Sequence, residues 1–191
     1  MRHATLDVIH DEHQALAAML RSMSLLVNQA LRENHAPDFG VLRAMLFYVD
    51  EFPERLHHPK ETELLFPKVR ERCPELRATL DRLDADHARG EAAIRELEHS
   101  MLAYEVLGDT RRAAFVASLE RYIDGYLSHM SAEESEILPA ARKHFTDDDW
   151  TTLDAAFAAN RDPLAGHEAD DVYKPLFRKI VMTAPAPVGL G

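Results

Sequence analysis

Apolar residues recur at three- and four-residue spacing through most of the chain, and no alternating stretch of strand length interrupts them. Such spacing is typical of amphipathic α-helices that bury one stripe of side chains, so the pattern predicts an all-α fold. A first helix is expected at about residues 5–33, and the segment NHAPD ends it. Its inward stripe is formed by Leu6, Ile9, His13, Leu16, Leu20 and Leu26.

Three further long helices are expected, at about residues 38–72, 75–106 and 110–144. The second helix contains Pro53, Pro59 and Pro67, so we expect it to be kinked, or broken near Pro53. Gly108 is a suitable C-terminal cap for the third helix. Because the connections are short, consecutive helices should be neighbours. This predicts an antiparallel up-down-up-down four-helix bundle over residues 1–145.

A short helical extension is expected to pack on this bundle at residues 146–181. The stretch TDDDW begins a helix, because Thr146 can cap its first turn and the acidic residues favour the positive end of the helix dipole. A last amphipathic segment at about 167–181 contains Pro175. The remaining residues, 182–191, end in APAPVGLG and are expected to form a flexible tail.

Composition narrows the class of protein and its partners. The 191 residues carry a formal net charge of −11, which disfavours nucleic acid and anionic membrane surfaces because both attract clustered Lys and Arg. Cys73 is the single cysteine, so an intrachain disulfide and a thiolate metal cluster are excluded. The N-terminal segment is charged, and no run approaches the ~20 apolar residues of a membrane span. We therefore expect a cytoplasmic protein that binds neither nucleic acid nor membrane.

Two stretches of the chain repeat the same offsets of histidine, glutamate and proline. In HHPKETELLFP, His57 is followed by Glu61 four positions later and by a proline ten positions later. In HMSAEESEILP, His129 is followed by Glu133 and by a proline at the same distances. Residues four apart on a helix lie one above the other, so each pair directs an imidazole and a carboxylate to one point in space.

The third predicted helix has the same spacing in His87 and Glu91, and the first helix supplies His13 alone. These histidines lie on the stripes expected to face the core, where an unpartnered imidazole or charge costs several kcal/mol. A cation would satisfy such groups together. Imidazole and carboxylate donors without thiolate suit iron, manganese or zinc, and seven donors exceed the four of a structural zinc site. The sequence therefore predicts two iron ions, with manganese or zinc as weaker alternatives, held by His13, His57, Glu61, His87, Glu91, His129 and Glu133.

The chain resembles the hemerythrin-like, or HHE cation-binding, family of four-helix di-iron proteins over about residues 5–145. The resemblance is carried by IHDEHQAL around His13, HHPKETELLFP with His57 and Glu61, DADHARGE around His87, and HMSAEESEILP with His129 and Glu133. It implies two non-haem irons with carboxylate and oxo bridges. The histidines would be terminal ligands. Glu61 and Glu133 would bridge the irons, with Glu134 as an alternative to Glu133.

One position departs from the oxygen-carrying members of that family. They have a further histidine one turn after the residue that matches His87, and this sequence has Glu91 there. A carboxylate in place of a neutral imidazole favours the ferric state, which disfavours reversible oxygen carriage. We therefore expect a protein that engages oxygen, peroxide or nitric oxide for sensing, redox chemistry or iron handling. Gly90 and Gly125, inside predicted helices and near proposed ligands, would leave space for such a small ligand.

Two other functions fit parts of the sequence. Glu54-x-x-His57 and Glu96-x-x-His99 have the spacing of ferritin-like di-iron carboxylate oxidases, although they leave three other core histidines unexplained. The second alternative is a metal-free helical interaction module, with the last two segments as a partner or homodimer surface. No motif specifies a substrate, so enzymatic activity stays open. We expect an outer or surface role for His58, because it points roughly 100° away from the face that carries His57.

Overall fold

The computed structural model describes residues 3–191. Across this range every regular element is helical and there is no strand, so the predicted all-α fold is confirmed. Met1 and Arg2, which fall in the predicted bundle at residues 1–145, lie outside the described residues. Among the described helices, none combines the length and the apolar character that crossing a bilayer requires.

The helices α1 and α5 are long and uninterrupted. α1 runs over Ala4–Arg32, and α5 runs over Arg77–Leu107 after a short 3-10 turn at Pro74–Leu76. α5 ends at Gly108, whose φ of 75° lies in the region that favours glycine. Gly108 is thus the cap that the sequence predicts.

The chain between α1 and α5 forms one rod in which α-helical and wider, π-helical turns alternate. The rod begins with α2, where the Val41 N–H donates to the Asp38 carboxylate at 3.0 Å. Pro53 lies inside the first π-helical segment, so the kink or break expected there takes the form of a widened turn. The segments in order are α2 at Phe39–Val49, a π-helix at Asp50–His57, α3 at His58–Lys60, a π-helix at Glu61–Leu65 and α4 at Phe66–Arg72.

The last long rod repeats this construction. A 3-10 turn at Gly108–Arg111 leads into α6 at Arg112–Ala132. A π-helical turn at Glu133–Ile137 then leads into α7 at Leu138–His144.

A proline follows each of the two matching wide turns, at Pro67 in α4 and Pro139 in α7. Proline has no N–H and clashes with the carbonyl four residues back in an α-helix. The turn before each proline widens instead. The Phe66 N–H donates to the Glu61 carbonyl, and the Leu138 N–H donates to the carbonyl of Glu133, each five residues back. The repeat in the sequence is therefore also a repeat in the structure.

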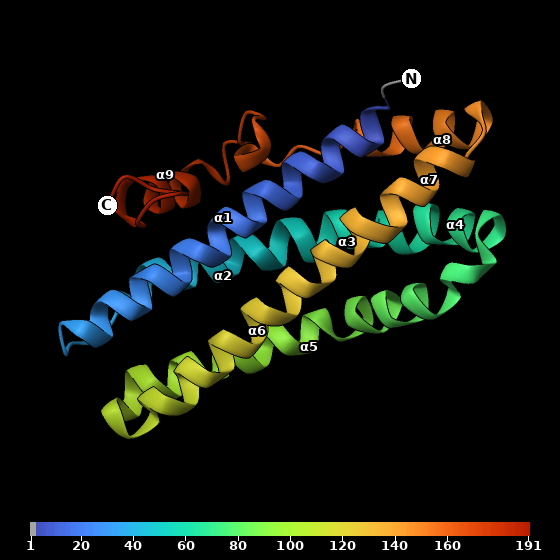
Figure 1. Ribbon diagram of the computed structural model, residues 1–191. Helices are drawn as coiled ribbons and strands as arrows, with labels where there is room; N and C mark the ends of the chain where they lie inside the picture. The colour runs from blue at the N-terminus through green and yellow to red at the C-terminus, as the bar shows by residue number, and fades with distance from the viewer. Residues whose placement is uncertain (1–2) are drawn as a thin grey trace.

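α1, the α2–α4 rod, α5 and the α6–α7 rod lie side by side, and the chain reverses direction from each to the next (Figure 1). Their apolar side chains form two clusters. The first, called the distal core here, includes Met19, Tyr48, Leu97 and Phe115. The second, called the proximal core, includes Ile9, Phe66, Leu83 and Ile137. Between the two cores each rod carries histidine or glutamate residues, so a polar layer crosses the interior.

The C-terminal segment adds buried side chains to both cores. α8, Asp147–Phe157, begins with a capping box in which the Asp149 N–H donates to the Thr146 hydroxyl, as predicted for Thr146. α9 runs over Lys174–Thr183. The proximal core contains Trp150 and Phe157 of α8, and the distal core contains Phe177 and Ile180 of α9.

The last residues fold back onto α9 and α1. The Leu190 N–H donates to the Val181 carbonyl at 2.8 Å, and the Ser22 hydroxyl of α1 donates to the Pro185 carbonyl at 2.8 Å. The sequence predicts a flexible tail at residues 182–191, and in the structure this segment makes such bonds to α9 and α1. The physical reason is that Ser22 is fully buried and needs a hydrogen-bond partner, which the tail supplies.

Candidate metal centre

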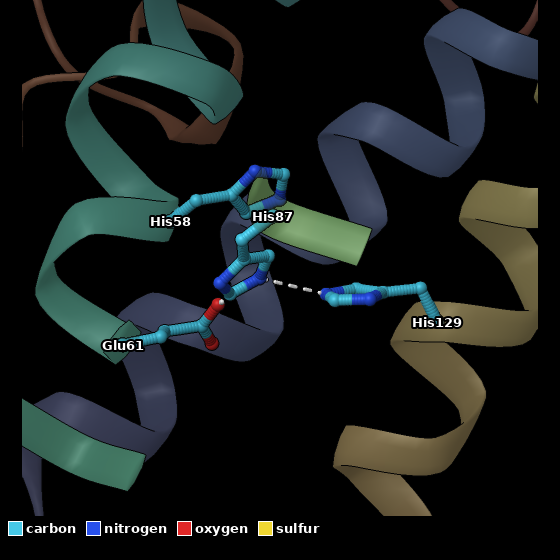
Figure 2. A group of neighbouring side chains, drawn as sticks. All are labelled: His58, Glu61, His87 and His129. Carbon is cyan, nitrogen blue, oxygen red and sulfur yellow. Dashed lines mark hydrogen bonds and ion pairs between the residues drawn. The ribbon is translucent and has the colours of Figure 1, made fainter. Parts of the chain in front are cut away.

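The polar layer brings together side chains from α1, the α2–α4 rod, α5 and the α6–α7 rod. Figure 2 shows part of it, with His129 facing His87 and with His58 and Glu61 beside them. The predicted ligand residues that meet in this layer are His13, His57, Glu61, His87, His129 and Glu133.

One group of side chains lies between α1 and the α2–α4 rod. His13, His57 and Glu61 each place a nitrogen or a carboxylate oxygen within 4.8 Å of the others. The distance from His57 Nε2 to Glu61 Oε1 is 3.2 Å. Glu133 also reaches this group, since its Oε2 lies 3.4 Å from His13 Nε2.

A second group joins the α2–α4 rod to α5 and α6. His58, Glu61, His87 and His129 again place ligand atoms within 4.8 Å of one another (Figure 2). His87 Nε2 lies 2.9 Å from His129 Nε2 and 3.6 Å from Glu61 Oε2. Glu133 completes the group, with its Oε1 3.2 Å from His129 Nε2.

Glu61 and Glu133 connect the two groups, because each turns one carboxylate oxygen to either side. Both glutamates are 0% exposed. Within residues 3–191 their four carboxylate oxygens have no partner other than the facing histidine nitrogens, which lie 3.2–3.9 Å away. Taking a carboxylate out of water without a partner costs several kcal/mol, so these residues need a positive charge between them. Carboxylate oxygen and imidazole nitrogen are donors that iron, manganese and zinc accept.

The histidine rings are held on their outer nitrogens. An Nδ1 atom that bonds a neighbouring acceptor leaves Nε2 free to face the centre, and such outer contacts fix the orientation of metal-binding histidines. These contacts also distinguish the two glutamates considered as bridging ligands. Glu134 contacts Nδ1, the outer nitrogen of His13, and Glu133 contacts Nε2, the inner one. The Nδ1 contacts are His13 with Glu134 at 3.1 Å, His57 with Glu12 at 2.6 Å, His58 with Glu54 at 3.2 Å, His87 with Thr62 at 2.7 Å and His129 with Asp86 at 3.5 Å.

The family model of the hemerythrin HHE cation binding domain matches residues 4–141. The chain belongs to this family. The match confirms the resemblance carried by the histidine and glutamate motifs, and its range contains both groups of side chains described above. Comparison with curated proteins and with solved structures gave no match.

In this hemerythrin HHE domain Glu91 lies outside the polar layer, which corrects the prediction that it is a ligand. Its side chain is 63% exposed and pairs with Arg95 on the surface of α5. The physical reason is the course of the buried stripe along α5, which passes from His87 through Gly90 to Ile94. Glu91 points roughly 100° away from Gly90 and roughly 40° away from His87, so it lies at the solvent edge of that stripe.

His58 takes the place that the sequence assigned to Glu91. It is 7% exposed, and its ring stacks on His87 with the ring centroids 4.1 Å apart. Adjacent residues on a helix point in different directions, but here both directions are buried: His57 faces α1 while His58 faces α5 and α6. The signal for His58 in the sequence was the doubled histidine itself, together with the missing second histidine on the third helix.

A residue beyond the family match also reaches the site. Asn160 follows α8, is 4% exposed, and donates from Nδ2 to Glu12 Oε2 at 2.9 Å. The same Glu12 oxygen accepts the bond from His57 Nδ1. The Lys60 ammonium group in turn donates to the side-chain oxygen of Asn160, Oδ1. The C-terminal segment therefore helps to orient His57 through Glu12, a role that no periodic pattern in the sequence could indicate.

Without a cation, the histidines divide into two electrostatic types. Burial opposes protonation of His13, but hydrogen bonds to Glu133 and Glu134 outweigh it and raise its pKa to about 9. Burial lowers the pKa of His58 and His87, and the neighbouring imidazoles lower it further, to about 2 for His87. The metal-free site thus holds protons beside Glu133, and a cation that binds there must displace them.

We expect the metal-free domain to lose stability as the pH rises from 6.5 to about 9. The folded pKa of His13 is raised from 6.5 to about 9, so its stabilising contribution is complete below pH 6.5 and is lost as the pH rises through 9. This difference corresponds to about 3 kcal/mol. Below pH 6.5 the lowered pKa of His87 acts in the opposite direction, because the unfolded chain then binds a proton that the folded chain does not.

Urea unfolding of chelator-treated protein between about pH 5 and 10 measures this profile, since the range includes both the histidine reference value and the raised pKa of His13. His13→Gln should reduce the alkaline loss, to which His57 and His129 also contribute through their raised pKa, and should leave the acid limb in place. A free energy of unfolding that stays level or rises between pH 6.5 and 9 would contradict the assignment of a raised pKa to His13.

Proposed function

We propose that this hemerythrin HHE domain binds two iron ions in the polar layer, and that the pair engages oxygen, peroxide or nitric oxide for sensing, redox chemistry or iron handling. One observation carries the proposal: two fully buried glutamates each turn one carboxylate oxygen to either histidine group. His13 and His57 would hold one ion, His58, His87 and His129 the other, and Glu61 and Glu133 would be shared. Manganese or zinc would suit the same donors and are the alternative occupants.

We assign the site to an antiparallel up-down-up-down bundle over residues 1–145, with a helical extension at 146–181. The reversal of direction between neighbouring rods supports the bundle (Figure 1). The burial of Trp150 and Ile180 supports an extension that packs on it.

Bound iron would supply a redox-active centre with affinity for small ligands. The protein supplies orientation through the Nδ1 contacts, and it excludes water by burial. The first group offers two imidazoles and the second offers three, so the ion held by His13 and His57 would have fewer donors from the protein. A cavity of about 10 Å³ beside these two residues is bounded by Glu12 and Asn160. This is about the least space that holds one water molecule, so only a very small ligand would fit there.

The ferritin-like alternative finds little support in the placement of its residues. Glu54 contacts His58 and accepts a hydrogen bond from Tyr126 instead of turning to His57. Glu96 and His99, the second pair of that motif, are exposed on α5. The metal-free alternative would leave two fully buried glutamates with histidine nitrogens as their only partners within the described chain.

The full chain, stripped with chelator and reloaded with ferrous iron without oxygen, is expected to retain close to two irons per chain. A ligand bound only by the folded state stabilises it by about 2.7 kcal/mol at a hundredfold excess over Kd. For a chain of this length that is a rise in Tm of roughly 5–10 °C. Elemental analysis and thermal unfolding give the two readouts. A ratio near zero, with no change of Tm on chelation, would refute the proposal.

Two substitutions test the assignment of the second group. His58→Ala removes one proposed donor and should lower iron retention to about one per chain or weaken it by more than tenfold, the scale of losing even an outer contact. Glu91→Gln is the matched control, because Glu91 was a predicted donor and lies on the surface. Equal iron content in both variants would mean that His58 is not a ligand.

A further inference from the structure

A hollow of about 480 Å³ opens beside the second histidine group, between α5 and α6. Its inner end is formed by the three imidazoles drawn in Figure 2, those of His58, His87 and His129. Tyr122 and Tyr126 of α6 line its side. The volume lies in the range of pockets that bind small organic molecules, about 300–1,000 Å³, and is far larger than a diatomic ligand requires.

Two glycines line this hollow. Gly125 lies on α6, and a Cβ added there would meet nothing within 4 Å, so any larger side chain would extend into free space at the hollow. Gly90 lies opposite on α5, where a Cβ would come within 2.1 Å of the Glu54 carboxylate. Glycine inside a helix costs about 1 kcal/mol relative to alanine, so two of them at facing positions need a local reason. Space for a ligand beside α6 provides one at Gly125.

The lining of the hollow differs in charge from the rest of the protein. Arg82 and Arg89 of α5 and Arg121 of α6 line it, although the chain as a whole carries −11. Asp86 pairs with Arg89 at 2.9 Å. Within the described residues, neither Arg82 nor Arg121 has an ion pair or a hydrogen bond to a side chain. Two exposed guanidinium groups on opposite walls are therefore available to an anion.

The remaining acid of the hollow contributes little negative charge to its open space. Glu54 accepts a hydrogen bond from the Tyr126 hydroxyl and contacts His58 Nδ1 at 3.2 Å, so both of its oxygens are engaged. Guanidinium groups match the planar, two-oxygen geometry of carboxylates and phosphates. The tyrosine rings offer a flat surface for an apolar body.

We propose that this hollow binds a small organic anion, with its carboxylate or phosphate at Arg82 or Arg121 and its apolar part against Tyr122 and Tyr126. The inference rests on the proposed function in one respect: the anion would lie next to the proposed metal centre. The binding site itself consists of residues outside both ligand groups.

Benzoate is a suitable probe because it combines a carboxylate with a flat apolar ring. Calorimetric titration of the full chain should show benzoate binding, whereas benzamidine, which has the same ring and the opposite charge, should not bind. Acetate should bind at least tenfold more weakly than benzoate because it lacks the ring. The double variant Arg82→Gln/Arg121→Gln should weaken benzoate at least tenfold, since hydrogen bonds between charged groups are worth about 1.5–3 kcal/mol.

The matched control is Arg21→Gln/Arg178→Gln, which removes the same charge from exposed positions elsewhere. A second variant, Gly125→Leu, fills the hollow with no change of charge and should also abolish benzoate binding. Iron content is measured on every sample, so the two proposals fail separately. If the chain holds two irons and the arginine and Gly125 variants bind benzoate as tightly as the unchanged chain, the proposed pocket is refuted. Benzoate binding that depends on the arginines in a chain unable to hold iron would support the pocket and refute the proposed function.

Discussion

Replacing Glu61 with glutamine is expected to abolish binding of both ions while leaving the metal-free protein at least as stable as before. Glu61 belongs to both histidine groups, so its loss removes a donor from each ion. Outer contacts alone alter metal affinity by about 10–100-fold, and the loss of a shared donor should exceed this. Iron content after reloading and exhaustive washing measures the effect.

The metal-free stability of that variant follows from the electrostatics of the site. Burial and the charge of Glu133 raise the pKa of Glu61, which means that its ionised form is unfavourable there. A neutral amide of the same shape should therefore raise the free energy of unfolding by about 1 kcal/mol. Urea unfolding of chelator-treated protein tests this, and a loss of several kcal/mol would show that Glu61 is a structural residue.

Glu133→Gln provides the informative contrast. Hydrogen bonds from His129 and His13 outweigh burial and lower the pKa of Glu133, so its charge stabilises the metal-free protein. Removing one partner of a buried ion pair costs about 3–5 kcal/mol. The two variants should thus lose iron alike and differ in the sign of their effect on metal-free stability. Glu91→Gln, which is exposed, should change neither quantity.

Deleting residues 146–191 is expected to prevent folding, even though the family match ends at residue 141. Trp150, Phe157 and Ile180 are at most 3% exposed, and the deletion would uncover the core surfaces that they contact. Burying one large apolar side chain contributes roughly 1.5–3 kcal/mol, so the loss approaches the 5–15 kcal/mol by which a typical domain is stable. Circular dichroism and binding of a dye to exposed apolar surface would report the change.

A milder variant separates this packing effect from the link to the site. Asn160→Ala keeps the apolar residues of α8 and α9 but leaves Glu12 without its amide partner. It should fold, lose about 1–3 kcal/mol and bind iron more weakly. A truncated chain that unfolds cooperatively and retains two irons would show that the C-terminal segment is dispensable.

The parts of the fold that depend on local spacing could be predicted from the sequence. Apolar residues at three- and four-residue spacing indicated long helices. Gly108 indicated where α5 ends, and Thr146 indicated where α8 begins. The paired glutamates at fixed offsets before a proline indicated side chains that meet, because offset along a helix sets direction. These features need no knowledge of what lies opposite.

The parts that depend on neighbouring rods could not be predicted. Whether His58 or Glu91 joins the cluster is decided by which faces of the second rod and α5 are covered, and residue spacing does not report that. Asn160 lies in an irregular stretch whose contact with Glu12 exists only after the chain has folded back over α1. The tail was predicted to be flexible, and its contacts with the buried hydroxyl of Ser22 and with the Val181 carbonyl form only once α1 and α9 are in place.

The paired wide turns bear on how the length of this chain can change. A π-helical turn accommodates one residue more than an α-helical turn, so Glu61–Leu65 and Glu133–Ile137 each contain the equivalent of a single-residue insertion. Removing one residue from either segment would restore an ordinary α-helical turn, so the residues beyond it would keep roughly the same facing. The proline that follows would then clash with the carbonyl four residues back. A one-residue deletion here should still be tolerated better than one elsewhere in the same rod, where everything beyond the gap rotates by roughly 100°.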